Sequence, residues 1–401
     1  MEKGITFIVT KDCQLACKYC YLVGKNSQER MPWEIAKLAI DYILSNEKDF
    51  PEQSVAWDFI GGEPFLEIGL IDKICDYIKT EMFRLNHHWF NSFRFHFSTN
   101  GINYDTQKVQ DFIKKNRQHL SIGITIDGTR EKHDLNRIWK MTDGFSPKPE
   151  EERGSYDDVV RNIPLWQEQF PFDGTKVTIS SADIKYIKDS VLHLYSLGIH
   201  EVNINVVFED VWKEGDDKRF EEQLIQLADA IIDGEYYTDY TCSFFSEHLG
   251  KPMDKKLQNN NWCGAGRMLA VDAAGNFYPC TRFAQYSLRD KKAWIIGNVH
   301  DGIDKNKLRP FLTLDRCTQS NQECIDCEVA EGCAWCQGEN YDAAETPTAF
   351  QRSTAICKMH KARVRANNYY WNKLYRKLEL QGIAREEAEK HVKKSNYQEP
   401  C

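Results

Sequence analysis

Three closely spaced thiols near the N-terminus are the residues best suited to chemistry in this chain. Cys13, Cys17 and Cys20 lie within eight residues of one another, directly after an apolar, strand-like run over 5–10. Three thiolates can hold three corners of an iron–sulfur cube and leave one iron open, whereas four protein thiolates are usual where a cluster only stores electrons. The spacing therefore predicts a metal centre with an open position for a small ligand.

The other cysteines indicate a second metal-bearing region. The chain has 14 cysteines, and eight of them fall between Cys263 and Cys357. Disulfide frameworks are rare in the cytosol. The sequence shows no charged and apolar N-terminal signal segment and no run of roughly 18 apolar residues. We therefore expect a cytoplasmic protein without a membrane partner, in which metal ligation explains the thiols.

The elements that must position these residues follow an alternating pattern. Apolar strand-like runs alternate with amphipathic helical stretches, as is typical of βα units around a parallel sheet. The expected strands are 5–10, 55–60, 92–98, 121–126, 176–181 and 202–208, and the expected helices are 32–45, 67–84, 105–117, 156–169, 187–197 and 217–233. Six such units predict a TIM-like barrel that is two units short of the full form.

A change in pattern near residue 235 predicts a domain boundary. Beyond it, cysteines, glycines and short turns replace the periodicity, and this region is expected to need metal in order to fold. We expect an α/β protein with a partial (β/α)6 barrel over 1–235, a small Cys-rich Fe–S domain over 236–360 and a C-terminal helical extension over 361–401. The segment 141–154 is expected to form a surface loop after the fourth strand.

The overall charge argues against a general nucleic-acid binder. The formal net charge is −8 and the isoelectric point is about 5.8. Proteins that bind nucleic acid generally show a basic domain or stripe. A content of 41% hydrophobic residues is enough for one large core or two smaller ones.

The N-terminal residues also resemble those of a known family. Cys13-x3-Cys17-x2-Cys20, followed by the aromatic Tyr21, resembles the signature of the radical S-adenosylmethionine (radical SAM) superfamily. Three further segments at the ends of successive expected strands match that family in order: Gly61-Gly62-Glu63-Pro64, Ser98-Thr99-Asn100-Gly101, and Thr125-Ile126-Asp127-Gly128 followed by His133-Asp134-Leu135-Asn136-Arg137. The resemblance covers the first half of the chain.

The resemblance implies a role for each of these segments. The three thiolates would hold a [4Fe–4S] cluster whose open iron binds the amino and carboxylate groups of SAM. The residues implied to contact SAM are Tyr21, Gly61, Gly62, Glu63, Pro64, Ser98, Asn100, Thr125 and Arg137. The glycine backbone would approach the amino group of SAM. Ser98 and Asn100 would bind its ribose. Thr125 and Arg137 would address the carboxylate. Asp127 is expected to be structural, and His133 is a candidate contact to SAM or substrate.

The second cysteine group resembles the seven-cysteine SPASM domain, which implies two auxiliary [4Fe–4S] clusters and three clusters in all. By this resemblance Cys263, Cys280 and Cys336 would ligate the first auxiliary cluster, and Cys324, Cys327, Cys333 and Cys357 the second. The family has three residues where this chain has two, Ala334 and Trp335, before Cys336. Cys317 is an extra thiol. It could complete the first auxiliary cluster, or the cluster could remain open for a substrate thiolate.

A zinc-ribbon-like site is the alternative for this region, because pairs of the form Cys-x2-Cys also suit tetrahedral zinc. The gap between the pairs is five residues here, against about 15–20 in the common zinc spacing. Iron–sulfur ligation is therefore favoured.

The resemblance implies that the protein reductively cleaves SAM to methionine and a 5′-deoxyadenosyl radical, which abstracts hydrogen from a substrate carbon. An auxiliary cluster would accept the surplus electron or hold a substrate thiolate. The chain looks most similar to maturases of ribosomal peptides that form thioether crosslinks, the ranthipeptide and sactipeptide group. The implied partners are a Cys-containing precursor peptide and an electron donor such as flavodoxin or ferredoxin.

Other functions remain open. An anaerobic sulfatase maturase, which oxidises Cys or Ser to formylglycine, shares the cluster arrangement, but its Asp after the second SPASM cysteine is replaced here by Thr281. A maturase forming C–C crosslinks is a further enzyme alternative, and a Zn or Fe–S scaffold or redox-responsive binding module is the non-enzyme alternative. With the first strand expected at Ile5, no leader-binding module precedes it. Leader binding would then fall to the 361–401 extension, the 141–154 loop or a separate protein.

Overall fold

Parallel strands and their covering helices form the first half of the computed structural model, which describes residues 2–23, 25, 27–141, 152–247, 249–254, 256 and 263–394. The strands β1 (Glu2–Thr10), β2 (Ser54–Gly61), β3 (Phe93–Thr99) and β4 (Leu120–Ile124) pair in parallel in this order. A bridge between Thr125 and Lys176 connects them to the parallel pair β5 (Thr175–Ile179) and β6 (Glu201–Val206). All six expected strands are present, with ends displaced by no more than three residues.

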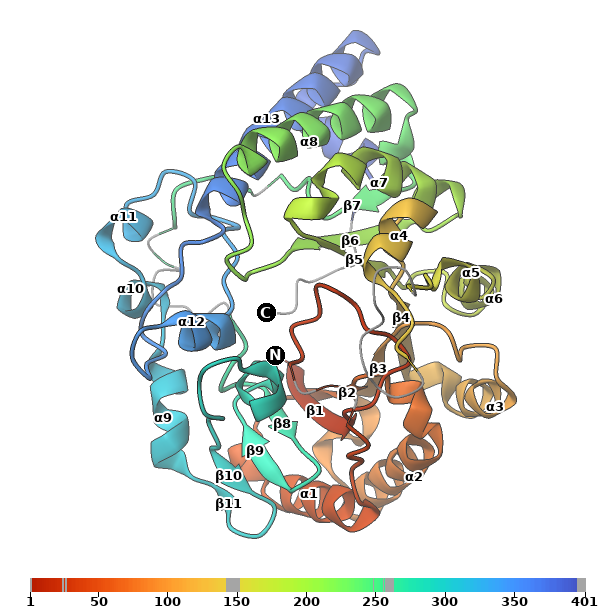
Figure 1. Cartoon of the computed structure of the whole chain (residues 1–401), viewed down its shortest axis with the longest axis vertical. Helices are drawn as coiled ribbons and strands as arrows, with labels where there is room; N and C mark the ends of the chain where they lie inside the picture. Colours follow the sequence, from red (N-terminus) through yellow and green to blue (C-terminus); the bar gives the residue numbers. More distant parts are fainter. Residues whose placement is uncertain are drawn as a thin grey trace.

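Helices cover the outer face of these strands (Figure 1). They are α1 (Trp33–Ser45), α2 (Ile68–Arg84), α3 (Gln107–Asn116), α5 (Tyr156–Val160), α6 (Ile163–Gln169), α7 (Ile187–Ser196) and α8 (Asp216–Asp233). In α2 the buried face contains Ile71, Ile74, Cys75 and Ile78, a spacing that places them on one side of a helix. Cys75 is therefore a core thiol.

Two helical features differ from the expectation. The single expected helix 156–169 is divided into α5 and α6, because Pro164 lacks the N–H that would continue the helical hydrogen bonding. An additional short helix, α4 (Arg130–Asn136), follows β4 and begins after Thr129, whose side chain accepts a hydrogen bond from the Lys132 amide. Residues 142–151 of the expected loop lie outside the described residues.

The Cys-rich region extends the barrel sheet. Its strand β8 (Leu269–Val271) pairs in parallel with β1, and β9 (Asn276–Tyr278), β10 (Gly297–Asn298) and β11 (Gly302–Ile303) continue the sheet in antiparallel fashion. A two-residue strand, β7 (Thr241–Cys242), pairs with β6. The helices of this region are short: α9 (Lys305–Thr313), α10 (Arg316–Gln319), α11 (Gln322–Ile325) and α12 (Gln337–Ala343).

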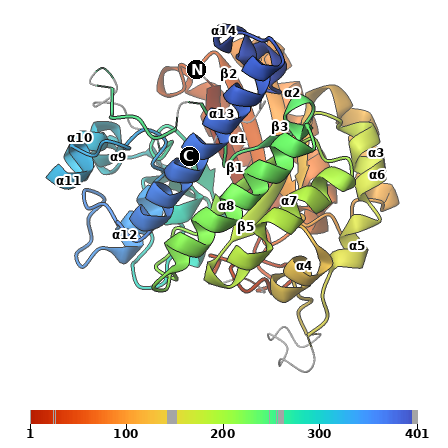
Figure 2. The same cartoon turned by 90° about the horizontal axis from the view of Figure 1, so that it is seen from above.

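The C-terminal helix α13 (Cys357–Leu380) is long and packs along α8 (Figure 2), and the short α14 (Arg385–Ala388) follows it. Its polar side chains pair with α8: Tyr369 and Lys373 both bond Asp229, at 2.7 and 2.8 Å, and Arg365 bonds Glu221 at 2.7 Å. Part of the basic charge of the extension is thus matched within the protein. No helix of the described ranges is long and apolar enough to cross a membrane.

Candidate active site and cysteine sets

The N-terminal cysteine loop lies between the end of β2 and the segment after α4. On one side the Gly62 amide donates to the Thr10 carbonyl at 3.1 Å, and on the other the Ala16 amide donates to the Ile138 carbonyl at 2.8 Å. Cys13 is buried, and Cys17 and Cys20 are half-buried. The sheet edge therefore fixes the loop backbone, while its thiols lie at the carboxyl ends of the parallel strands, where barrel enzymes carry their sites.

Two glycines permit this close contact. A Cβ on Gly61 would overlap the carbonyl oxygen of Thr10. A Cβ on Gly62 would overlap the carbonyl oxygen of Asp12 and lie 2.8 Å from the Cβ of Cys13. Both distances are shorter than real Cβ contacts, so any side chain here would push the cysteine loop away from β2.

Glu63 ties the end of β2 to the end of β3. Its buried carboxylate accepts hydrogen bonds from the Phe65 amide (3.0 Å), the Thr99 hydroxyl (2.7 Å) and the Asn100 amide (2.7 Å). Burial raises the pKa of Glu63, and these three bonds oppose the shift. Pro64, also buried, occupies the first position of a short 3₁₀ helix. The structure thus gives both residues a role in shaping the site.

The remaining predicted strand-end residues lie along the same edge. Asn100 donates to the Gln14 side chain at 3.0 Å, and its Nδ2 is 3.9 Å from the sulfur of Cys13. Ser98 is half-buried near the end of β3, and Thr125 directly follows β4. Asn100 therefore contacts the cysteine loop itself, whereas Ser98 and Thr125 lie at the ends of neighbouring strands.

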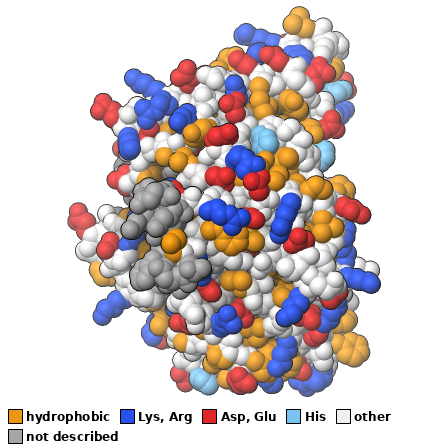
Figure 3. Space-filling model, turned by 45° about the vertical axis from the view of Figure 1, so that its right-hand side comes forward, with side chains coloured by type: hydrophobic (Ala, Val, Ile, Leu, Met, Phe, Trp, Pro, Cys, Tyr) orange, Lys and Arg blue, Asp and Glu red, His pale blue; other side chains and the backbone are white. Residues whose placement is uncertain are grey.

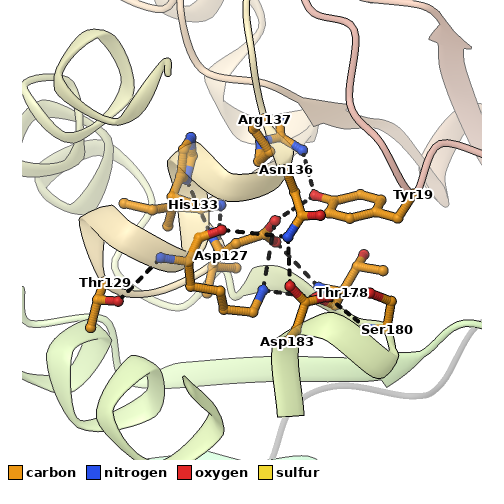
Figure 4. A network of polar contacts seen from close by, with 12 residues as sticks. Tyr19, Asp127, Thr129, His133, Asn136, Arg137, Thr178, Ser180 and Asp183 are labelled. Atoms are coloured by element: carbon orange, nitrogen blue, oxygen red, sulfur yellow. Dashed lines mark hydrogen bonds and ion pairs between the residues drawn. The ribbon is translucent and has the colours of Figure 1, made fainter. Parts of the chain in front are cut away.

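Arg137 is buried behind the cysteine loop (Figure 4). Its Nη1 donates to the Tyr19 hydroxyl at 3.1 Å, and that hydroxyl donates to Asp127 at 2.5 Å. Its Nε has no hydrogen-bond partner among the described residues. Burial raises the pKa of Cys17, and the Arg137 charge opposes this shift. A buried guanidinium with an unsatisfied N–H beside a thiol suits an anionic ligand group.

A buried lysine completes the charge balance around Asp127. Lys132 Nζ lies 3.8 Å from Asp127 and donates to the Thr178 carbonyl at 2.8 Å. Burial opposes ionisation of Asp127, but the charges of Lys132 and Arg137 outweigh it and hold the pKa of this carboxyl below its usual value. The expectation that Asp127 is structural fits these contacts.

Both ring nitrogens of His133 have protein partners. Its Nδ1 accepts from the Asp127 amide at 3.3 Å, and its Nε2 lies 3.0 Å from the Ser155 hydroxyl, which itself donates to the Arg137 carbonyl at 2.7 Å. These partners require a neutral ring with the proton on Nε2. Burial, followed by the charge of Arg137, lowers the pKa of His133 to about 3. The ring is thus linked through the Ser155 hydroxyl to the backbone carbonyl of Arg137.

Two residues of this network were not singled out from the sequence. The aromatic character of Tyr19, between Cys17 and Cys20, was a signal that could have identified it. Lys132 carried no such signal, because a lysine in a short polar segment is normally exposed.

Tyr21 lies between the two cysteine-bearing regions. The guanidinium carbon of Arg282 is 4.4 Å from the centroid of the Tyr21 ring. Although 39% of the Tyr21 surface is exposed, the surrounding protein desolvates the phenol and raises its pKa to about 12, and Cys20, Cys280 and Cys336 contribute to the shift. The phenol is thus within electrostatic reach of thiols from both regions.

Arg282, which was also not singled out from the sequence, connects three parts of the chain. Its Nη2 donates to Glu209, after β6, and to Glu339, in α12, each at 2.9 Å. With its position over Tyr21, this arginine joins the cysteine loop, the barrel and the Cys-rich region.

The thiols expected to form the first auxiliary set, Cys263, Cys280 and Cys336, lie within electrostatic reach of one another. Burial raises the pKa of Cys263, and the next largest influences are Cys336 and Cys280. The spacing of two residues before Cys336 still allows this thiol, directly before α12, to turn toward the other two.

The thiols expected to form the second auxiliary set, Cys324, Cys327, Cys333 and Cys357, are also within electrostatic reach of one another. Burial raises the pKa of Cys324, and Cys357 and Cys327 contribute to the shift. Burial also raises the pKa of Cys333, with contributions from Cys357 and Cys324. Cys317 directly follows Arg316 on α10. Burial lowers the pKa of Arg316, and Cys317 is among the groups that oppose this shift. Burial raises the pKa of Tyr195 and of Tyr370, and the buried Cys242 contributes to both shifts.

A single zinc ion requires its ligand atoms to lie close together. With Zn–S bonds of 2.3 Å, tetrahedral ligands lie about 3.8 Å apart. Among the described residues, the group whose ligand atoms lie within 4.8 Å of one another is Glu47, His87 and His88, and no cysteine trio is that compact. All 13 described cysteines are free thiols. The thiols of each set are therefore placed more widely than the ligands of one zinc ion.

Comparison with known proteins agrees with this geometry. Residues 4–143 match a family model described as a 4Fe-4S single cluster domain. The uncharacterized protein MJ0907 of Methanocaldococcus jannaschii is 27% identical over 312 residues, which are 77% of this chain and 91% of that protein. The cysteine-type anaerobic sulfatase-maturating enzyme of Clostridium novyi is 29% identical over 161 residues, 39% of this chain and 38% of that enzyme.

A solved structure has the same fold over nearly the whole chain. Native anSMEcpe with bound AdoMet and Cp18Cys peptide matches with a TM-score of 0.66 and 19% identity, covering 93% of this chain and all of that one. The chain is a relative of the radical SAM maturases. This structure shares the parallel-strand α/β fold of the chain over both the barrel and the Cys-rich region, so the fold class expected from the sequence is confirmed.

Proposed function

We propose that this radical SAM protein forms an intramolecular thioether crosslink, from a Cys sulfur to a carbon, in a ribosomal precursor peptide. The observation that supports it most is the position of Tyr21. Its phenol is within electrostatic reach of Cys20 on one side and of Cys280 and Cys336 on the other. A substrate held beside this ring would meet both metal-bearing regions.

The residues described above would hold three [4Fe–4S] clusters and SAM. Cys13, Cys17 and Cys20 would hold the SAM-binding cluster, and the two auxiliary sets would hold one cluster each. When bound, these cofactors supply a 5′-deoxyadenosyl radical for hydrogen abstraction and acceptors for the surplus electron. An electron donor such as flavodoxin or ferredoxin is the proposed partner for reduction.

The protein's own groups would bind and orient SAM. The unsatisfied Nε of Arg137 is suited to the SAM carboxylate, and the Tyr19 hydroxyl fixes the direction of the guanidinium. Thr125 would assist at the carboxylate, and Ser98 and Asn100 would bind the ribose. The backbone at Gly61 and Gly62 leaves room for the amino group because neither residue has a Cβ.

The first auxiliary set is the feature that favours a thiol-containing substrate. It brings Cys263, Cys280 and Cys336 within electrostatic reach of one another. Three protein thiolates leave room for a fourth, from the substrate. Thr281, which follows Cys280, has no carboxylate to act as the base expected of a sulfatase maturase.

Formylglycine formation is the second candidate, and the relationship to sulfatase-maturating enzymes favours it. The two candidates share SAM cleavage and differ in the fate of sulfur. A thioether retains the sulfur and removes two hydrogens, whereas conversion of Cys to formylglycine removes the sulfur from the side chain.

Mass spectrometry of a small Cys-containing peptide, co-expressed anaerobically with the protein, separates these outcomes. We expect loss of two hydrogens per crosslink and thiols that no longer react with alkylating reagents. Loss of sulfur from the peptide would establish the second candidate instead. The protein should contain about twelve irons and release 5′-deoxyadenosine with dithionite and SAM, and Cys17→Ala should abolish that release. Stoichiometric zinc, or no 5′-deoxyadenosine from wild type, would contradict the family function altogether.

A further inference from the structure

An arginine points directly at a sulfur of the second auxiliary set. Arg352 Nη2 donates to the Cys333 sulfur at 3.0 Å, and its Nη1 donates to the Ser320 hydroxyl at 3.2 Å. The guanidinium carbon lies 4.6 Å from the centroid of the Trp335 ring. These contacts hold the guanidinium in one place, with an N–H directed at the thiol.

The charge of Arg352 is not neutralised by a carboxylate in the described part of the chain. Its polar contacts are Ser320 and the sulfur and carbonyl of Cys333. The charge opposes the burial that raises the pKa of Cys333 and of Cys324, so it reaches at least two thiols of the set.

The first auxiliary set has a different environment. Its nearby arginine, Arg282, bonds two carboxylates, those of Glu209 and Glu339. Arg282 therefore adds little net positive charge at Cys280 and Cys336. The arginine at the first set is thus paired with carboxylates, whereas Arg352 at the second set is not paired with one among the described residues.

Solvent exposure differs in the same direction. Cys263 and Cys280 of the first set are buried, and Cys336 is half-buried. All four thiols of the second set, Cys324, Cys327, Cys333 and Cys357, are half-buried. Water stabilises the more highly charged state of a cluster, so exposure favours reduction at the second set.

We propose that Arg352 raises the reduction potential of the iron–sulfur centre held by Cys324, Cys327, Cys333 and Cys357, making it the more readily reduced of the two auxiliary centres. One-electron reduction adds negative charge to the centre and its thiolates. A charge-assisted N–H···S bond and an unneutralised cation stabilise that state. This inference rests on the proposed function, because it requires both sets to hold clusters.

The proposal assigns a direction to electron transfer. An electron released from the substrate beside the first set would reduce the centre there. It would then pass to the second set, so that the first centre is reoxidised and the second is reduced by one electron. No further co-reactant is needed for this step.

Potentiometry monitored by electron paramagnetic resonance tests the proposal in the full-length, reconstituted protein. The substitutions Cys13→Ala, Cys17→Ala and Cys20→Ala remove the N-terminal centre, so that two auxiliary couples remain. In this background Arg352→Met should shift the higher couple downward by at least tenfold in its reduction equilibrium, which is 59 mV for one electron. The lower couple should change by less than threefold.

Two further variants separate the causes. Arg352→Lys keeps the charge but loses the planar fork, so it should give a smaller shift in the same direction. Arg309→Met removes an exposed arginine on α9 of the same region, and both couples should change by less than threefold.

The proposal is overturned if Arg352→Met retains about eight irons and leaves both couples unchanged. If Arg352→Met loses about four irons, the Arg352→Lys variant is measured in its place. An unshifted higher couple in Arg352→Lys would then overturn the proposal. The wild-type protein gives an independent readout, because an N–H···S bond should shift the Fe–S stretching bands in D2O. Wild type that binds zinc or shows no auxiliary couple would instead contradict the proposed function.

Discussion

At the scale of single residues, the charges behind the cysteine loop are balanced through a phenol. Arg137 and Asp127 both bond the Tyr19 hydroxyl, and Lys132 approaches Asp127 from the opposite side at 3.8 Å. All of these side chains are buried or nearly so. A buried charge that loses its partner destabilises a protein strongly, so the position of Arg137 depends on the whole group.

Asp127→Asn should therefore destabilise the protein by about 3–5 kcal/mol. The substitution removes the nearer carboxylate from the fully buried Lys132 ammonium and leaves Asp183 as the remaining acidic group that acts on it. Urea unfolding at pH 7 measures the effect. The matched control is Asp157→Asn, which breaks an exposed ion pair with Arg130 and should cost at most about 1 kcal/mol. Equal effects of the two substitutions would contradict this account.

The stability should also depend on pH through His133. Its pKa is about 3 in the folded protein and about 6.5 in the unfolded chain. The unfolded state therefore binds more protons between these values. The contribution of the neutral ring is complete above pH 6.5 and is lost progressively as the pH falls toward 3, at up to about 1.4 kcal/mol per pH unit.

His133→Gln removes this titration, so its unfolding free energy should fall less steeply than that of wild type between pH 6.5 and 5. The control His391→Gln changes an exposed histidine, and its curve should run parallel to the wild-type curve. Parallel curves for His133→Gln and wild type would show that the ring is not the titrating group.

Local spacing explains which of these residues could be predicted. The cysteines of each set are recognisable because their ligand roles follow from closely spaced residues of one type. The Cys333 contact of Arg352 and the Asp127 contact of Lys132 depend on side-chain directions in irregular segments. No periodicity encodes such directions, so the residues that tune the thiols emerge only from the fold.

At the scale of elements, the junction between β2 and the cysteine loop is the most sensitive point. Gly62→Ala would place a Cβ against the Asp12 carbonyl and within 2.8 Å of the Cys13 Cβ. We expect the displaced loop to lose its cluster, so that the iron content falls from about twelve to about eight and SAM cleavage is lost.

Iron analysis and 5′-deoxyadenosine release measure this effect. Gly69→Ala provides the control, because nothing lies within 4 Å of the added Cβ in α2 and alanine favours a helix. Retention of about twelve irons by Gly62→Ala would contradict the proposed role of the junction.

The elements differ in how far the sequence predicts them. The barrel strands carry buried apolar residues either almost continuously, as in β1, or in alternation, as in β3 and β5, so their positions follow from the sequence. Helix α4 could not be predicted in this way, because Arg130–Asn136 is polar and is held by tertiary contacts of Lys132 and His133. The strands β8 to β11 have only two or three residues each, too few to show alternation.

At the scale of the whole molecule, the barrel and the Cys-rich region differ in what stabilises them. The barrel has long strands and helices around a large apolar core. The region of the second cysteine set has helices of four residues, α10 and α11, which are too short to be stable alone. On the face drawn in Figure 3, acidic and basic side chains are interspersed, in line with the modest net charge.

Removal of iron should therefore unfold this region selectively. In anaerobic hydrogen-exchange mass spectrometry, a chelator should remove the protection of segment 316–357, because metal–thiolate bonds supply its folding energy. Strands β2 to β4 should keep their protection, and they serve as the internal control. Equal loss of protection in both parts would show that the whole chain depends on metal, and no loss in either would show that neither does.

The pairing of β1 with β8 also concerns synthesis on the ribosome. Leu269, which opens β8, is made 259 residues after Thr10, which closes β1. At 5–20 residues per second, one edge of this apolar strand waits roughly 13–50 s for its neighbour. A chain terminated before Leu269 would keep all six parallel strands and the first three cysteines. It would nevertheless expose β1 as an unpaired edge, a template for aggregation.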